Sequence, residues 1–380
     1  MTIRWYDQKN LHECEWGESE NQQYARKFLT PFIENGTAKY IANVNTRVGI
    51  LTVDELVLPV TVNDAEYGNS YVVSPFDQYI TYTKEELYLI KNPLLESILG
   101  GFLSGFGSLL RLLSINKVVI VNNWMVSTNL YPYIKREQLA QIKAFLLKKF
   151  PDHAIIFRSV EDYRNQSLFE SLTQMGFHML ISRQIFLMDT SQRINSRARY
   201  NLGKDEKILA HTPYQVVEHG EILADDMQRI LDNYNALYLE KYSPNNPQFT
   251  DEFFHLAHKE RLLQMKLLKK DGHVDAILGY FHRDGVMTTP LFGYDTRLPK
   301  EWGLYRMISL LLLYDARKYG YLLHASSGAA EFKKSRGALE SFEYNAVYLN
   351  HLPWVRKLPW RLLKSLLEKV AKPLVQKYSR

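Results

Sequence analysis

Three observations predict a mixed α/β protein built from two modules of similar size. In the first half, short apolar runs at 117–121 and 154–157 alternate with helical patterns at 136–149 and 166–175, before a long strand at 178–188. This alternation is typical of a mostly parallel sheet with helices packed across it. The second half again combines helices with strands, and 380 residues of which 46% are hydrophobic suffice for two cores.

The region before these elements is less regular. We expect a helix at 22–34, because this stretch ends at Asn35-Gly36, where a helix commonly terminates. Thr, Val and Ile alternate through 39–44 and 48–62, which predicts strands of a meander. A further strand is expected at 69–73.

Residues 94–113 are rich in Leu, Phe and Gly and are long enough to cross a bilayer. However, Glu96 and Arg111 lie within this segment, and charged side chains are costly in hydrocarbon. Four glycines also weaken it as a helix in water. The composition therefore favours a buried or interfacial helix over a membrane span.

The second half begins with a basic stretch at 191–201, which contains Arg193, Arg197 and Arg199. Apolar periodicity then predicts helices at 222–242, 251–259, 303–319 and 329–335. Runs rich in β-branched and aromatic residues predict strands at 262–269, 274–282, 286–294, 321–325 and 344–349. We therefore expect an N-terminal module over 1–190, a C-terminal module over 191–350 and a tail over 351–380.

The net charge of +6 is concentrated in the tail. Residues 351–380 contain eight Lys or Arg and one acid, Glu368, so the tail carries +7 and the rest of the chain sums to −1. By charge, the body is therefore not a DNA-binding protein, and it offers a transfer RNA little attraction.

The tail is predicted to form a basic amphipathic helix. Two tryptophans precede a stripe of apolar residues at helical spacing: Trp354, Trp360, then Leu363, Leu366, Leu367, Val370 and Leu374. This pattern suits an anionic membrane surface contacted through 354–380. It suits equally well a helix that packs its apolar side on the protein's own core.

Several motifs carry a resemblance to a known superfamily. The run Ala154-Ile155-Ile156-Phe157 is followed by a helix that closes with Gly176-Phe177. In the second half a Gly293-Tyr294-Asp295 element precedes the long apolar helix that starts near Gly303. An element with Phe332-Lys333 and Gly337-Ala338 comes later. In this order, the chain resembles the GNAT acyltransferase superfamily in its tandem form. Its C-terminal half resembles the branch that includes the Fem-type peptidoglycan-bridge aminoacyltransferases.

The resemblance implies a site for the donor's phosphates at the start of the long apolar helix, where unpaired backbone N–H groups favour anions. The residues that it places there are Lys300, Gly303, Leu304 and Tyr305, with Ser326, Ser327 and Arg336 nearby. Tyr305 stands where the family has a small residue, so this cradle departs from the usual pattern. The alternative is that Gly303 only begins a helix and binds nothing.

The resemblance also implies that Lys333 steadies the oxyanion that forms when an amine attacks the donor carbonyl. Asp295 is the first candidate for the general base and Glu331 the second. Alternatively, Lys333 is a solvated lysine at a helix end, and Asp295 caps the turn that follows it. The sequence shows no metal-binding motif and no phosphate-binding loop.

These residues lead to three hypotheses about function. The first is an N-acyltransferase that moves an acyl group from acyl-CoA or an acyl carrier protein to a small or lipid-linked amine, with no tightly bound cofactor. The second keeps the fold but takes the acyl group from aminoacyl-tRNA, and the third is a non-catalytic scaffold at a membrane. A single cysteine and a start without an apolar leader favour the cytoplasm, with a peripheral position on the inner face of the membrane.

Overall fold

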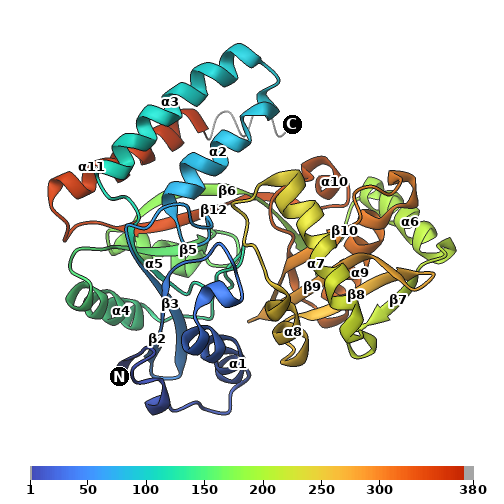
Figure 1. Cartoon of the computed structure of the whole chain (residues 1–380), viewed down its shortest axis with the longest axis horizontal. Helices are drawn as coiled ribbons and strands as arrows, with labels where there is room; N and C mark the ends of the chain where they lie inside the picture. The colour runs from blue at the N-terminus through green and yellow to red at the C-terminus, as the bar shows by residue number, and fades with distance from the viewer. Residues whose placement is uncertain (1, 372–380) are drawn as a thin grey trace. The chain divides into compact units, whose positions relative to one another are not determined.

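The structure is a computed structural model that describes residues 2–371 (Figure 1). The chain divides into two compact units, and each is described by itself. Of the described residues, unit 1 comprises 2–182, 245–248 and 343–371, and unit 2 comprises 183–244 and 249–342. The predicted second module ended at 350, whereas residues 343–371 belong to unit 1. Residues 372–380 of the predicted tail lie outside the described residues, among them Lys372, Leu374, Lys377 and Arg380.

Unit 1 contains a mixed sheet. Its strands follow the order β1 (Ile3–Tyr6), β2 (Arg47–Val53), β3 (Leu56–Asp64), β4 (Lys117–Val121), β5 (Ala154–Val160) and β12 (Leu339–Tyr348, from residue 343). β4 and β5 run parallel, and the other neighbours run antiparallel. A parallel pair needs a crossover, and the helix α4 (Arg136–Lys149) lies within the connection.

Alternation along β4 places one core on each face of this sheet. Val119 and Val121 pack with α4 and α5 (Gln166–Gln174). Val118 and Ile120 lie in the opposite core, which includes residues of α3 (Pro93–Leu112) and α11 (Trp354–Leu366). The helix α1 (Glu20–Asn35) contacts β2 and β3, and the short α2 (Tyr82–Glu85) precedes α3.

The helix α3 is long and apolar enough to cross a membrane, and only 17% of its most apolar window is buried. Its inner side, with Leu103, Gly107 and Leu110, packs on the rest of unit 1. α11 packs on the same face of the sheet through Trp360 and Leu363, which are both 1% exposed. The first part of the tail therefore docks on the protein's own core.

The strands of unit 2 are also of mixed direction. Its strands follow the order β6 (His178–Asp189, from residue 183), β11 (Leu322–His324), β10 (Val286–Tyr294), β9 (His273–Arg283), β8 (Gln264–Lys270) and β7 (Gln215–Glu218). Here β10 and β11 are the parallel pair, and α9 (Leu304–Tyr319) lies in their crossover. This confirms the predicted α/β class with mixed sheets.

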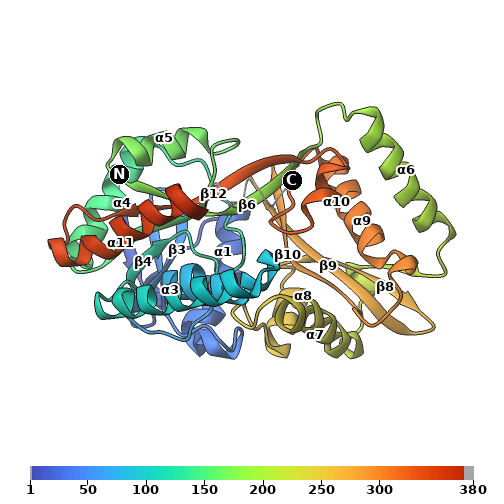
Figure 2. The same ribbon diagram turned by 90° about the horizontal axis from the view of Figure 1, so that it is seen from above.

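Helices cover both faces of the unit 2 sheet (Figure 2). α9 packs on the face that carries Ala276 and Leu278, and α6 (Ser196–His211) packs against α9. α7 (Met227–Asn235) and α8 (Asp251–Lys259) lie on the other face. Gly293 allows β10 to approach α7, because a Cβ at this position would lie 2.6 Å from the carbonyl oxygen of Asn233.

Several sequence-based expectations are wrong. Residues 39–44 and 69–73 form turns and a short 3-10 helix instead of strands. These parts of the chain are connected by individual hydrogen bonds and not by the ladder of a strand pair. The N–H of Ser70 donates to the carbonyl oxygen of Asn43, and the side-chain amide of Asn69 donates to the carbonyl oxygen of Asn45. The helix α6 was not predicted at all, although Asn195 caps it by accepting from the N–H of Ala198.

Candidate active site in unit 2

The two parallel strands of unit 2 separate part of the way along. β10 and β11 pair from Val286 with Leu322 to Thr288 with His324, and there the pairing stops. β10 continues to Tyr294, paired only with β9 on its other side. The separation leaves backbone groups beside the end of β11 without a strand partner, as the GNAT resemblance implies for the acyl donor.

One aromatic ring connects the three motifs that the sequence singled out. The Tyr305 ring in α9 lies 5.4 Å from Phe292, 6.1 Å from Tyr294 and 4.8 Å from Phe332, between ring centroids. Tyr294 belongs to the Gly-Tyr-Asp element, and Phe332 precedes Lys333. Burial raises the pKa of the Tyr305 phenol. The fold therefore assembles these motifs at one place.

Lys333 lies in α10 (Ala330–Lys334) and is half-buried. Nζ donates to the carbonyl oxygens of Ala325 at 2.5 Å and Ser327 at 2.7 Å, and lies 5.5 Å from the Phe186 ring centroid. Burial, followed by the nearby positive charge of Arg183, lowers the pKa of Lys333 to about 7. An ammonium has three N–H donors, so one remains for a ligand.

The loop after β11 holds Lys333 through its backbone. Ser326 has a left-handed backbone, with φ of 58°, and its carbonyl accepts from the N–H of Phe186. Ser327 contributes a carbonyl to Lys333 and has an exposed side chain. Of the two serines that were predicted to bind the donor, Ser327 thus holds the lysine, and Ser326 bonds to Phe186.

The carboxylate of Asp295 is buried and already accepts hydrogen bonds from two arginines. Its carboxylate accepts from the backbone N–H of Arg297 at 3.1 Å, from the Arg297 guanidinium at 2.9 and 2.6 Å, and from Arg229 at 3.4 Å. The hydrogen bonds from Arg297 lower the pKa of Asp295 to about 2, so it is a weak base near neutral pH. It serves as a turn cap, which is the alternative that the sequence left open. Glu331 lies exposed in the first turn of α10.

The start of α9 does not fit a pyrophosphate cradle. Gly303 has φ of 71°, and an added Cβ would lie 3.0 Å from the side chain of Ile208 in α6. Leu304 is buried, and the Tyr305 ring fills the position of the family's small residue. Lys300 lies exposed in a 3-10 turn (Lys300–Trp302). The helix α6 therefore packs close to this end of α9, where the resemblance places the donor's phosphates.

Arg336 belongs to a buried ionic network that the sequence did not reveal. Asp205, which is 1% exposed, accepts from Arg336 at 2.5 and 2.9 Å and from Arg306 at 2.5 Å. In the sequence, Asp205 stands in the charged run Lys204-Asp205-Glu206-Lys207, which is typical of a solvated helix face. No local signal distinguishes the buried member of such a run.

The corresponding position in unit 1 is filled by side chains. After β4, Trp124 is 1% exposed, and its indole N–H donates to Asn122. Arg158 at the end of β5 is also buried, and it donates to the carbonyl of Val72 and to Asn123. Of the two units, unit 2 is therefore the better candidate for chemistry.

Comparisons with known proteins bear on the fold. No family model matches the sequence, and a search among curated proteins finds no match. Among solved structures, FemX is 9% identical, with a TM-score of 0.52 over 92% of this chain and 100% of FemX. The C-terminal domain (DUF2156) of a putative lysylphosphatidylglycerol synthetase from Agrobacterium fabrum is 14% identical, with a TM-score of 0.45 over 62% of this chain and 78% of that domain. L-PGS from Bacillus licheniformis is 15% identical, with a TM-score of 0.44 over 60% of this chain and 78% of that protein. The chain therefore shares its fold with FemX, as the sequence resemblance predicted.

Proposed function

We propose that this chain is an acyltransferase in which unit 2 transfers an acyl group from an activated ester or thioester to an amine. The proposal rests on the position of Lys333 and on the hydrogen bonds of its ammonium group. Lys333 is half-buried, and carbonyl oxygens fix two of the three N–H groups of its ammonium, which leaves the third for a ligand. It lies just past the end of β11, where β10 and β11 have separated.

In this mechanism the amine attacks the donor carbonyl, and the carbonyl oxygen becomes an oxyanion. The Lys333 ammonium donates its remaining N–H to this oxygen and stabilises the developing negative charge. The bond to the leaving oxygen or sulfur then breaks, and the amine nitrogen loses its proton. Asp295 is too weak a base for that proton, so Glu331 becomes the first candidate.

The packing at the start of α9 favours a donor that does not depend on a pyrophosphate cradle. The Tyr305 ring packs against Phe332 there, and the Ile208 side chain lies beside Gly303. We therefore propose a carrier-borne acyl group: a thioester on an acyl carrier protein, or an ester on a transfer RNA.

A thermal-shift and transfer panel tests this donor class. We expect acetyl-CoA and longer acyl-CoAs to leave the melting temperature of the protein unchanged. Acyl carrier protein or aminoacyl-tRNA should raise it, because only a ligand of the native state stabilises that state. A clear shift with acetyl-CoA would contradict the donor assignment. Absence of transfer from every donor to a set of amines would contradict the enzyme and favour a scaffold.

We further propose that unit 1 rests on an anionic membrane surface, on the inner face, which would suit a lipid-linked amine. The proposal is supported by the outer side of α3, where Ile98 is 59% exposed and Phe102 is 50% exposed. An apolar stripe of this kind is uncommon on a protein surface that faces only water. On the same face of the unit 1 sheet, α11 exposes Trp354 and Arg361, which are residue types that favour lipid interfaces.

Point variants on α3 test the membrane proposal without removing Trp360 from the core. We expect Phe102→Glu to lower binding to vesicles that contain phosphatidylglycerol by about tenfold or more, because it places a charge where an apolar ring would enter lipid. Tyr133→Glu is the matched control, since Tyr133 is exposed in unit 1 outside both helices. Equal co-sedimentation of wild type and Phe102→Glu would refute the proposal.

A further inference from the structure

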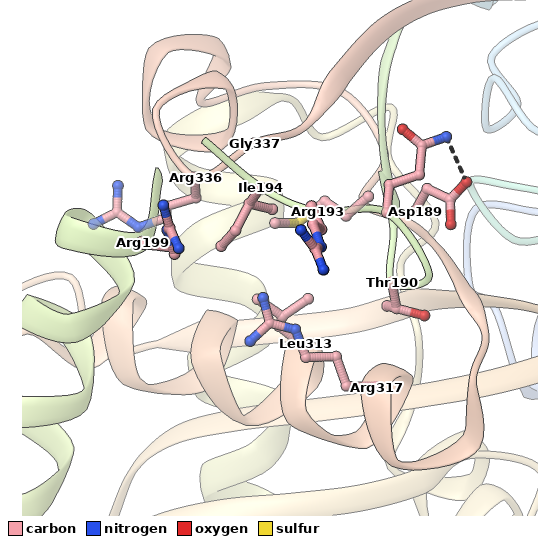
Figure 3. Close-up of a pocket in the computed structure, with 11 residues that line it drawn as sticks. Asp189, Thr190, Arg193, Ile194, Arg199, Leu313, Arg317, Arg336 and Gly337 are labelled. Atoms are coloured by element: carbon pink, nitrogen blue, oxygen red, sulfur yellow. Dashed lines mark hydrogen bonds between the residues drawn. The ribbon is translucent and has the colours of Figure 1, made fainter. Parts of the chain in front are cut away.

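Unit 2 has a second feature that acyl transfer does not use, a pocket of about 600 Å³ (Figure 3). It lies beside the end of β6, the first turn of α6 and the last turns of α9. Asp189 on its rim pairs with Leu322, the first residue of β11. Lys333, by contrast, binds carbonyls that follow the last residue of this strand. The pocket and the candidate active site are therefore at opposite ends of β11.

Four arginines line this pocket, and one acid accompanies them. Arg193, Arg199, Arg317 and Arg336 supply the positive charge, and Asp189 is the acid. Figure 3 shows Arg193 and Arg317 reaching toward the middle of the pocket from opposite sides. The sequence marked Arg193 and Arg199 as part of a basic stretch, but only the fold adds Arg317 from α9.

Most of this positive charge is not neutralised by the protein. Arg336 is paired with the buried Asp205. Among residues 2–371, no carboxylate forms an ion pair with Arg193, Arg199 or Arg317. All three are exposed to solvent, so their guanidinium groups are available to an anion that enters the pocket.

The chemistry of the lining indicates what kind of anion fits. Guanidinium groups bind phosphate through paired, charge-assisted hydrogen bonds, and several together favour a ligand with at least two negative charges. Ile194 and Leu313 add apolar surface for the non-phosphate part of a ligand. The volume is that of a small-molecule site. We propose that this pocket binds a phosphate-bearing small molecule through Arg193, Arg199 and Arg317.

Titration calorimetry on the full chain tests the site, with inorganic pyrophosphate and glycerol 3-phosphate as probes at low salt. We expect saturable binding of at least one probe, with a Kd that rises as salt is added. Arg317→Gln and Arg193→Gln should each weaken binding by about tenfold or more. Arg197→Gln is the matched control, because Arg197 is exposed in the same basic stretch but does not line the pocket.

The two probes distinguish the source of the phosphate. Preference for pyrophosphate indicates a nucleotide-like ligand, and preference for glycerol 3-phosphate indicates a lipid headgroup; either result supports the site. Failure of both probes to bind, or equal affinity in wild type and Arg317→Gln, would overturn the proposal. Because neither readout involves acyl transfer, the pocket and the proposed enzyme can fail independently.

Discussion

Replacing Lys333 with alanine is expected to lower kcat by about 10²–10³-fold while KM changes little. The lysine would contribute mainly in the transition state, because only then does the carbonyl oxygen carry the negative charge that its free N–H stabilises. Steady-state kinetics with the donor identified by the panel would measure the effect. Lys334→Ala is the matched control: Lys334 is the next residue in α10 and pairs with Glu340, and its loss should change kcat by about twofold at most.

The pH dependence of kcat/KM tests the same residue in a second way, because it reports the pKa values of the free enzyme. Because the pKa of Lys333 is lowered to about 7, the ammonium form is lost as pH rises through this value. Wild-type kcat/KM should therefore contain a limb that falls above about pH 7. Lys333→Arg keeps its charge at every accessible pH, so this limb should be absent from its profile. A Lys333→Ala protein with near wild-type kcat would eliminate Lys333 as the oxyanion-stabilising group.

Replacing Asp205 with asparagine is expected to reduce the free energy of unfolding of unit 2 by about 3 kcal/mol. Asp205 is the shared carboxylate of Arg306 and Arg336, and the Arg336 side chain is only 12% exposed. Without the carboxylate, this guanidinium keeps a positive charge away from water with no counter-charge. Hydrogen exchange of α6 and α9 peptides measures the loss in unit 2 separately from unit 1.

The control for this prediction is Asp225→Asn, which removes an exposed carboxylate from the same unit and should change stability by about 0.5 kcal/mol or less. Exchange of α6 and α9 amides at the wild-type rate in Asp205→Asn would show that the network does not stabilise this unit. Since Asp205 lies outside the separated strands, the variant should retain the pH profile of the wild type even though it unfolds more easily.

The elements that could be predicted are those with strong local patterns. β4 and α4 were expected with their observed bounds, and β5 and β6 ended three residues and one residue later than expected, because apolar spacing decides both the element and the buried side. The strand expected at 39–44 failed because a β-rich composition does not ensure a partner strand. The α6 helix was hidden by its many charges, and its apolar side is defined only by the packing of Leu202 and Ile208 against α9.

The candidate site also has a part that the sequence predicted and a part that it did not. Motif order led to Lys333, Asp295 and Tyr305, and the fold connects two of these motifs with the start of α9 through the Tyr305 ring. The sequence could not show how strong a base Asp295 is, because the pKa of its carboxyl depends on hydrogen bonds from Arg229 as well as from Arg297. It could not find Arg317 as a neighbour of Arg193 either, since more than a hundred residues separate them along the chain.

The amino-acid sequence by itself determined the α/β class, the helices and strands with strong local patterns, and the position of the uneven charge, because these depend on residue spacing and composition. The tertiary structure decided which charges are buried, which are paired and which converge. Solvation and Coulomb energies depend on distances between residues that are remote in the chain, and local patterns contain no information about those distances.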